Sequence, residues 1–281
     1  MKAHRHQFPV TLMARVFEVS RSGFYRWMKS KASDRSHQQQ GLDDQVRSIF
    51  DAHKGRYGAP RVQRELSAIG RHHNEKTIAA SLRRQGLRAK AAKRFKATTY
   101  SNHALPVAPN LLEQDFSADQ PNEKYVQDIT YISTDEGWLY LAVVIDLYSR
   151  QVVGWAMRDR MKAGLVCDAL TMALFRRGMP KGVIVHSDRG SQYCSHRFQS
   201  LIEKHQLRCS MSKKGDCYDN ACAETFFHSL KVELIHGVRY TTREEAKRAI
   251  FDYIETYYNR IRRHSSIGYM SPAAFEIKSV A

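Results

Sequence analysis

Three acidic residues interrupt segments whose other residues are typical of strands or of a helix. Asp128 lies inside an apolar, β-branched run at 125–132, and Asp188 ends the apolar run 183–185 in a glycine-containing turn at 186–191. Glu224 lies in a strongly helical segment. Two strand carboxylates and one helix carboxylate that converge make an all-oxygen site. We therefore expect a fold in which these three segments meet.

Such a site suits hard divalent cations and phosphoryl transfer on nucleic acid. Three clustered carboxylates repel one another and raise one another's pKa values. Two Mg²⁺ ions about 3.5–4 Å apart, with Mn²⁺ as a substitute, relieve this repulsion and clamp the attacking and leaving oxygens of a phosphodiester. Mg²⁺ keeps several waters, which leaves room for water or a 3′-hydroxyl as the nucleophile. We predict Asp128, Asp188 and Glu224 as the catalytic residues and the metal ligands.

Other acidic residues have simpler explanations. Asp146 starts a turn between two apolar strands and is interpreted as a hairpin residue, with a supporting role beside the site left open. Asp216 and Asp219 are interpreted as a loop residue and a helix cap. Ser187 lacks the sequence context of a nucleophile elbow.

The three acids lie in sequence blocks that resemble the catalytic blocks of DDE recombinases, the transposases and retroviral-type integrases with an RNase H-like core. The blocks are 127–131 (QDITY), 186–193 (HSDRGSQY) and 218–227 (YDNACAETFF). Among these, the chain more closely resembles the transposase encoded by the second reading frame of the insertion sequence 3 family. That resemblance covers nearly the whole chain, including the C-terminal residues 258–272.

The spacing of the blocks adds to the resemblance. There are 59 residues between Asp128 and Asp188, 35 between Asp188 and Glu224, and Lys231 follows Glu224 by seven. Relatives usually carry Trp three residues before the first Asp, where this chain has Tyr125. Because Tyr fills a similar space and adds a hydroxyl, this departure concerns packing rather than catalysis.

The resemblance implies a DNA transposase that cleaves element ends and joins the freed 3′-hydroxyl to another strand. It implies double-stranded DNA, as element ends and as target, and a homo-oligomer on that DNA. In relatives the frame is often fused by frameshifting to an upstream-frame DNA-binding protein. Two alternatives stay open: an RNase H-like nuclease, and a non-catalytic DNA-binding regulator. The basic front of the chain and Lys231 weigh against the first, and the intact acidic triad weighs against the second.

Positive charge is concentrated in the first hundred residues. Residues 1–100 hold 22 Lys and Arg against 7 Asp and Glu, whereas residues 101–281 hold 23 against 21. The front of the chain is therefore interpreted as a polyanion-binding region and the rest as a nearly neutral body. No long apolar segment or signal peptide is present, which disfavours a membrane role.

The five cysteines all lie after position 166 and are odd in number. This usage favours a reduced, cytoplasmic protein, bound to the bacterial nucleoid when on DNA, over a disulfide scaffold. No Cys precedes Cys167, so the chain has no N-terminal His/Cys zinc module. Cys217, Cys222 and His228 do not have the spacing of a common zinc site.

Two segments in the front region are predicted to be helix–turn–helix units. In residues 11–29, Leu12, Val16 and Phe17 form an apolar stripe, and Ser20 caps a second helix that buries Phe24 and Trp27 or Met28. In residues 57–88, Pro60 opens a helix that Gly70 ends, and Asn74 opens another that Gly86 ends. If the second helix of each unit enters the major groove, the DNA-binding residues are Arg21, Arg26, Lys76 and Arg83. A pair of helices used only for packing is the alternative in each unit.

A basic run follows and leads to a connector. Residues 88–100 lack apolar periodicity and are interpreted as a linker that follows phosphates, through Lys90, Lys93 and Arg94. Residues 101–122 contain several Pro and Asn and are predicted to be extended. The domain organisation we expect is 1–50 and 51–100 for the two helix–turn–helix segments, 101–122 for the connector, and 123–281 for the catalytic core with a C-terminal helix.

The remaining pattern is α/β. Strands are predicted at 125–132, 138–145, 151–157, 182–187 and 207–211, and helices at 162–177 and 195–206. The first three strands have short connections and are expected to be antiparallel. With a final helix bearing Glu224, they fit a mixed five-stranded sheet flanked by helices, the RNase H-like arrangement that the resemblance implies.

The Glu224 helix is expected to begin at Asp219 or Asn220 and to bury Ala223, Phe227, Leu230 and Leu234. Lys231 lies two turns beyond Glu224 on the same side, about 10.5 Å away at ~1.5 Å per residue, and is predicted to contact a phosphate. A capping box, Thr242 and Glu245, opens a last long helix. The basic tail at 260–264, which contains Arg262, is assigned to DNA or dimer contacts without a choice between them.

Overall fold

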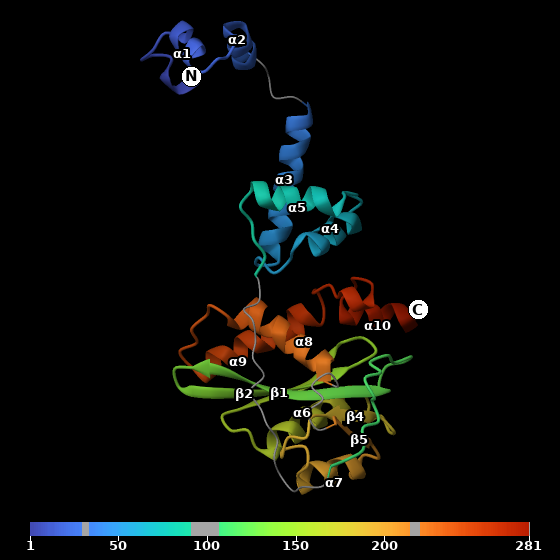
Figure 1. Ribbon diagram of the computed structural model, residues 1–281. Helices are drawn as coiled ribbons and strands as arrows, with labels where there is room; N and C mark the ends of the chain where they lie inside the picture. The colour runs from blue at the N-terminus through green and yellow to red at the C-terminus, as the bar shows by residue number, and fades with distance from the viewer. Residues whose placement is uncertain (30–33, 91–106, 214–219, 281) are drawn as a thin grey trace. The chain divides into compact units, whose positions relative to one another are not determined.

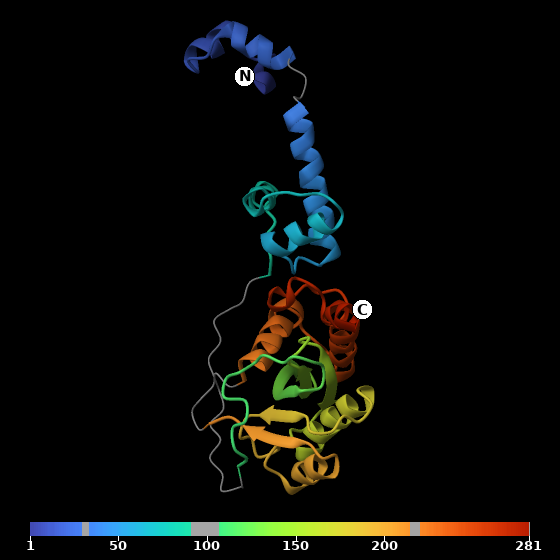
Figure 2. The same ribbon diagram turned by 90° about the vertical axis from the view of Figure 1, so that its right-hand side faces the viewer.

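The computed structural model describes residues 1–29, 34–90, 107–213 and 220–280 (Figures 1 and 2). The chain divides into two compact units, Met1–Ala89 and Lys90–Ala281. Within the described ranges, no helix is long and apolar enough to cross a membrane.

The first unit begins with a short 3-10 turn, η1 Lys2–His4, and two short helices, α1 Val10–Val16 and α2 Arg21–Lys29. Ser20 caps α2 as expected, since its hydroxyl accepts a hydrogen bond from the Gly23 amide at 2.8 Å. The predicted apolar stripe of α1 is wrong. Met13 and Ala14 are buried, whereas Leu12, Val16 and Phe17 are 48%, 68% and 60% exposed.

The second part of this unit is a three-helix cluster of α3 Asp34–Ala52, α4 Ala59–Ala68 and α5 Glu75–Arg84. Helices α4 and α5 have the predicted limits. Pro60 stands in the first turn of α4, and the Asn74 side chain accepts a hydrogen bond from the Lys76 amide. Gly70 and Gly86 have φ values of +76° and +66°, the left-handed conformation that ends a helix. Helix α3 was not predicted.

The second unit contains a mixed five-stranded sheet in the order β3-β2-β1-β4-β5. Strands β1 Lys124–Thr134, β2 Gly137–Asp146 and β3 Val152–Arg158 form an antiparallel meander. Strand β4 Ile184–Ser187 is parallel to β1, and β5 Arg208–Met211 is parallel to β4. The predicted RNase H-like mixed sheet, its strands and its antiparallel meander are confirmed.

Helices cover both faces of this sheet. Helices α6 Ala163–Arg176 and α7 His196–Lys204 lie on one face, and α8 Ala221–Leu230 and α9 Arg243–Phe251 lie on the other (Figure 1). Gly154 on β3 allows α6 to approach closely, because a Cβ there would lie 2.7 Å from the Ala173 nitrogen. The connector also packs on the core, with Leu112 only 2% exposed.

Both helices of the second face continue as π turns. Helix α8 continues as η3 Lys231–Ile235, and α9 continues as η4 Asp252–Tyr258. A 3-10 turn, η5 Ser265–Ile267, and a C-terminal helix, α10 Pro272–Val280, follow. Helix α9 opens as predicted, with the Thr242 hydroxyl accepting a hydrogen bond from the Glu245 amide.

Two predictions for this region are wrong. The α8 stripe does not include Leu234; Phe226 and Glu233 are buried in addition to Ala223, Phe227 and Leu230. The tail residue Arg262 is not a surface cation for DNA or a second subunit. It is 4% exposed and pairs with Glu233, because a buried arginine must find an anionic partner within the fold.

Candidate active site

Strand pairing brings the first two predicted acids side by side. In the parallel register of β1 and β4, Val126 stands opposite His186. Asp128 and Asp188 each follow these residues by two positions, so both lie where the two strands separate, at neighbouring positions of the sheet. Strands are spaced by about 4.8 Å in this direction. Asp128 is half-buried, and one of its oxygens accepts a hydrogen bond from the Ile129 amide at 2.7 Å.

The turn after β4 fixes Asp188. One oxygen of its carboxylate accepts a hydrogen bond from the Gly190 amide at 2.9 Å. A Cβ on Gly190 would lie 2.9 Å from that same oxygen, so a larger residue there would push the Asp188 carboxylate out of this position. The Arg189 Nε donates to the Ser212 carbonyl at 2.6 Å.

His186, two residues before Asp188, connects β4 to two serines of the β5 region, a role that the sequence did not predict. It is fully buried on β4, with its two ring nitrogens 2.8 Å from the Ser210 hydroxyl and 3.2 Å from the Ser212 hydroxyl. Its position in the same block as Asp188 was the only sequence signal, because both serine partners come from the β5 region.

Glu224 lies in the first turn of α8, and the start of this helix is attached to β1. The side-chain nitrogen of Asn220 donates to the backbone carbonyl of Gln127 at 3.3 Å, one residue before Asp128. Asn220 occupies the N-cap position without a capping side-chain bond. The other predicted cap, Asp219, lies outside the described residues, as do Asp216 and Cys217.

The three carboxylates interact electrostatically. Burial and the neighbouring Asp188 hold the pKa of Asp128 well above its usual value, and Glu224 adds to the effect. Partial burial also raises the pKa of Glu224. The protein therefore disfavours a set of three negative charges here unless positive charge is supplied. Carboxylate oxygens are the donors that Mg²⁺ prefers, so this donor set fits a hard divalent cation.

The carboxylates are not gathered into a finished coordination shell. Among the residues that the structure describes, no three His, Cys, Asp or Glu side chains stand close enough together to hold a metal ion.

Lys231 directly follows the last residue of α8 and opens η3. It is half-buried, and its Nζ stands 5.5 Å from the centre of the Tyr131 ring. Burial lowers its pKa, while Tyr131 and Asp128 act in the opposite direction. Lys231 is thus within electrostatic reach of the candidate site.

Two buried side-chain amides beside the acids carry atoms that have no hydrogen-bond partner among the residues that the structure describes. The side-chain amide of Gln127, which is 1% exposed, has no partner at either atom, and the Asn220 oxygen has none. Gln127 directly precedes Asp128, and Asn220 precedes Glu224 by four residues. Unsatisfied buried amides are costly in a packed core.

The predicted DNA-binding residues of the first unit are exposed. Arg21 and Arg26 lie on α2, and Lys76 and Arg83 lie on α5. The latter two are seven residues apart and share one side of α5, opposite the buried Ile78 and Leu82.

Of the predicted linker residues, Lys90 makes a contact within its own unit. Lys90 donates to the backbone carbonyl of Glu233 at 2.9 Å, which attaches the start of the second unit to its own core. Lys93 and Arg94 lie outside the described residues.

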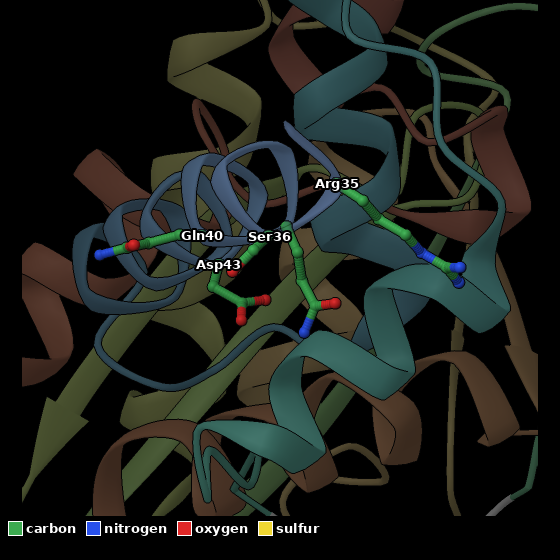
Figure 3. Close-up of a pocket in the computed structure, with 5 residues that line it drawn as sticks. Arg35, Ser36, Gln40 and Asp43 are labelled. Atoms are coloured by element: carbon green, nitrogen blue, oxygen red, sulfur yellow. The ribbon is translucent and has the colours of Figure 1, made fainter. Parts of the chain in front are cut away.

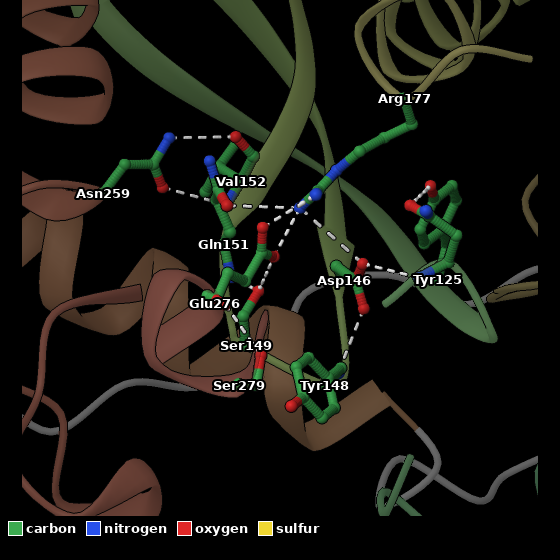
Figure 4. Close-up of polar contacts among 11 residues, drawn as sticks. Tyr125, Asp146, Tyr148, Ser149, Gln151, Val152, Arg177, Asn259, Glu276 and Ser279 are labelled. Atoms are coloured by element: carbon green, nitrogen blue, oxygen red, sulfur yellow. Dashed lines mark hydrogen bonds and ion pairs between the residues drawn. The ribbon is translucent and has the colours of Figure 1, made fainter. Parts of the chain in front are cut away.

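A separate polar cluster surrounds Asp146, which is fully buried (Figure 4). Its carboxylate accepts hydrogen bonds from the Asn122 and Tyr148 amides, and the Arg177 guanidinium stands 3.7 Å away. Burial raises the pKa of Asp146 to about 6. Arg177 also binds Glu276 of α10 at 2.5 Å, so this cluster joins the turn after β2 to the C-terminal helix.

A shallow hollow lies along α3 in the first unit (Figure 3). Its volume is about 330 Å³, and it is lined by Arg35, Ser36, Gln39, Gln40 and Asp43. The lining is polar on one helix face, and Asp43 is paired with Arg84 at 2.6 Å. The hollow has no apolar wall and is not interpreted as a small-molecule site.

Family models match most of the chain. Residues 118–217 and 224–280 match two models described as integrase core domains, and residues 37–95 match an HTH-like domain. The first two ranges contain β1 to β5, helices α6, α7, α9 and α10 and most of α8, and the third contains α4, α5 and most of α3.

Full-length relatives are similar throughout. The chain is 56% identical over 283 aligned positions to the transposase InsF for insertion sequence IS3A of Escherichia coli, covering 100% of this chain and 98% of the relative. It is 45% identical over 266 positions to an uncharacterized 31 kDa protein of insertion element IS600 of Shigella sonnei, covering 95% and 98%.

A solved structure is more distant. A simian T-cell lymphotropic virus intasome, in complex with a PP2A regulatory subunit, matches with 15% identity and a TM-score of 0.48, covering 83% of this chain and 74% of the other.

Proposed function

The chain belongs to the IS3 family of insertion-sequence transposases with an integrase core, and we propose that it cleaves the ends of its element and joins them to target DNA through Asp128, Asp188 and Glu224. The observation that carries this proposal is the register of β1 and β4, which sets Asp128 beside Asp188, together with the attachment of the Glu224 helix to β1.

The proposed reaction is two successive phosphoryl transfers. In the first, a water oxygen bonds to phosphorus at the element end, and the bond to the 3′ oxygen breaks, which frees a 3′-hydroxyl. In the second, that 3′ oxygen bonds to a target-strand phosphorus, and a bond from this phosphorus to its neighbouring 3′ oxygen breaks. Each step exchanges one P–O bond for another, so no external energy source is required.

The acids are proposed to hold the metal ions. Asp128, Asp188 and Glu224 would hold Mg²⁺, or Mn²⁺ in its place, and two such ions would neutralise the phosphodiester and lower the pKa of the attacking hydroxyl. The raised pKa of Asp128 supports this assignment, because a bound cation favours the charged carboxylate. The β4 turn orients Asp188, and the start of α8 orients Glu224.

The cations of the chain are proposed to hold DNA. Lys231 would contact a phosphate beside the acids as a point charge. The helices of the first unit, with Arg21, Arg26, Lys76 and Arg83, would bind the element end, and Lys90, Lys93 and Arg94 would follow the backbone of the DNA. We further propose a homo-oligomer on double-stranded DNA, fusion to or pairing with an upstream-frame protein, and a place in the cytoplasm.

The test uses duplexes with the terminal inverted repeat read from the DNA that flanks the coding sequence. We expect blunt ends to be cleaved and pre-cleaved ends to be joined to a second duplex when Mg²⁺ or Mn²⁺ is present, and both reactions to stop with a chelator. Cleavage without joining of pre-cleaved ends would favour an RNase H-like nuclease. DNA binding with neither reaction would favour a regulator.

A further inference from the structure

A buried ion pair lies directly beyond Lys231. Glu233, in the π turn η3, and Arg262, in the C-terminal tail, are each 4% exposed. The Arg262 Nε donates to both oxygens of Glu233, at 2.9 and 3.0 Å, and Nη2 donates to Oε1 at 2.7 Å. The guanidinium thus grips the carboxylate at two points, a geometry that fixes orientation as well as distance.

The pair also holds the helix on the other side of Lys231. Nη2 of Arg262 donates to the Ser229 hydroxyl at 2.9 Å. Ser229 precedes Lys231 by two residues, and Glu233 follows it by two. One guanidinium therefore connects the last turn of α8 to the π turn, with Lys231 between its two contacts.

Further contacts anchor Glu233. The Tyr253 hydroxyl donates to Glu233 Oε2 at 2.9 Å, and the Lys90 ammonium donates to the Glu233 carbonyl at 2.9 Å. The carbonyl of Lys231 itself closes the π turn by accepting a hydrogen bond from the His236 amide at 2.7 Å. The position of the backbone at Lys231 is thus fixed by the π turn, because Glu233 at the centre of that turn is bound by Arg262, Tyr253 and Lys90.

Energetics argue against fold stability as the main reason for this pair. The desolvation cost of two buried charges roughly cancels their attraction, and well-packed apolar side chains are often as good or better. A π turn is a rare interruption of a helix and is frequent at functional sites. A buried pair that holds such a turn beside a candidate active site is therefore explained better by a need to fix the position of the backbone there.

We propose that Arg262 is a positioning residue for the transfer reactions: by gripping Ser229 and Glu233, it fixes the helix at Lys231 so that the Lys231 ammonium stays above the Tyr131 ring and meets DNA beside the acids. This inference rests on the proposed function. Arg262 touches neither DNA nor the reacting atoms in this role, and it acts only through Lys231.

The informative variant replaces both charges. Arg262→Met alone leaves Glu233 buried without its partner and destabilises the protein, whereas Glu233→Leu with Arg262→Met removes both charges at similar volume. We expect this double variant to fold with a smaller loss of melting temperature than Arg262→Met, because the groups that lose a partner are the Tyr253 and Ser229 hydroxyls rather than a buried carboxylate. We expect it to lose joining of pre-cleaved ends by about ten- to a hundredfold, as does Lys231→Ala, a loss typical of one charged contact. The matched control is Arg158→Gln with Asp168→Asn, an ion pair between β3 and α6, which should join at the wild-type rate.

Two readouts separate positioning from a purely structural role. The slope of the logarithm of end-DNA affinity against the logarithm of salt concentration should fall by about one, the loss of one phosphate contact. This decrease should be the same in the double variant and in Lys231→Ala. In addition, the triple variant should be no worse than Lys231→Ala, because both changes remove the same contact.

Three outcomes would overturn the inference. A folded double variant that joins at the wild-type rate leaves the pair without a positioning role. A triple variant whose defect is the product of the separate defects shows that Arg262 acts independently of Lys231. If the double variant does not fold, Arg262→Lys replaces it as the test, because lysine keeps the positive charge but cannot bind the Glu233 carboxylate at two points. We expect Arg262→Lys to join pre-cleaved ends less efficiently than the wild type. Joining at the wild-type rate would refute the positioning role of Arg262. Failure of the wild-type protein to join ends would instead refute the proposed function.

Discussion

Replacing Gly154 with Ala should strongly destabilise the catalytic unit. Gly154 lies on β3 directly beneath α6, and an added Cβ would overlap the carbonyl of Ala169. It would also lie 2.7 Å from the nitrogen and 2.8 Å from the Cβ of Ala173, where carbon contacts are ordinarily about 3.5–4.0 Å. Two of these three atoms belong to the helix backbone, so no side chain can rotate away and α6 must move off the sheet.

The size of the effect follows from this geometry. Overpacking by a methyl group costs roughly 1–3 kcal/mol, and a clash with backbone on a buried strand belongs at the upper end, about 3 kcal/mol. For a unit of this size, each kcal/mol lowers the melting temperature by about 2–4 °C, which gives a decrease of roughly 6–12 °C.

Differential scanning calorimetry of the full chain measures this decrease. Gly41→Ala is the matched control, because a Cβ at Gly41 in α3 meets nothing within 4 Å. Since Gly41 lies inside a helix, that change should stabilise the first unit by up to about 1 kcal/mol. If Gly154→Ala leaves the melting temperature of the second unit unchanged, the close packing of β3 on α6 is wrong.

Three further predictions concern charge. Fragment 1–100, with its net charge of +15, should bind duplex DNA with an affinity that falls steeply as salt rises, as a binding titration would measure; salt-independent binding would move the DNA-binding role elsewhere. Lys231→Ala should lower joining by about ten- to a hundredfold while sparing Mn²⁺ affinity; loss of metal binding would contradict its assignment to DNA. Because the pKa of Asp146 is raised to about 6, the folded protein binds a proton at this carboxyl more tightly than the unfolded chain does. The contribution of Asp146 to the free energy of unfolding therefore falls as pH rises from about 4 through 6. Denaturant titrations should therefore show Asp146→Asn gaining stability over the wild type across that range, by at most about 1.4 kcal/mol per pH unit, and a constant difference would refute the shift.

The catalytic sheet was predictable because its signals are local. Strands β1 and β2 alternate or run apolar over ten or more residues between clear turns, and α4 and α5 carry Pro, Asn and Gly at their ends. Helix α3 was missed because it is largely polar and buries only Leu42, Val46 and Phe50. A stripe of three apolar residues in nineteen gives little periodicity.

The sequence predicts burial incorrectly where a side chain is buried by residues far away along the chain. In α1, seven residues make only two turns, so the sequence could not distinguish Met13 and Ala14 from Leu12 and Val16 as the buried side. Arg262 was interpreted as a surface cation because its partner, Glu233, is 29 residues earlier and lies in a π turn that follows no 3.6-residue pattern. Sequence spacing reveals charges but not which of them the fold will bury together.

The most direct test of the central proposal measures cleavage and joining by Asp128→Asn. The change keeps the size of the side chain and removes the negative charge that the proposed metal ions require. The control is Asp159→Asn, an exposed acid in the turn after β3, which should match the wild type in every assay. We predict that Asp128→Asn binds element-end DNA but neither cleaves blunt ends nor joins pre-cleaved ends in Mg²⁺ or Mn²⁺. Cleavage of element ends by this variant at the wild-type rate would contradict the assignment of Asp128, Asp188 and Glu224 as the catalytic triad.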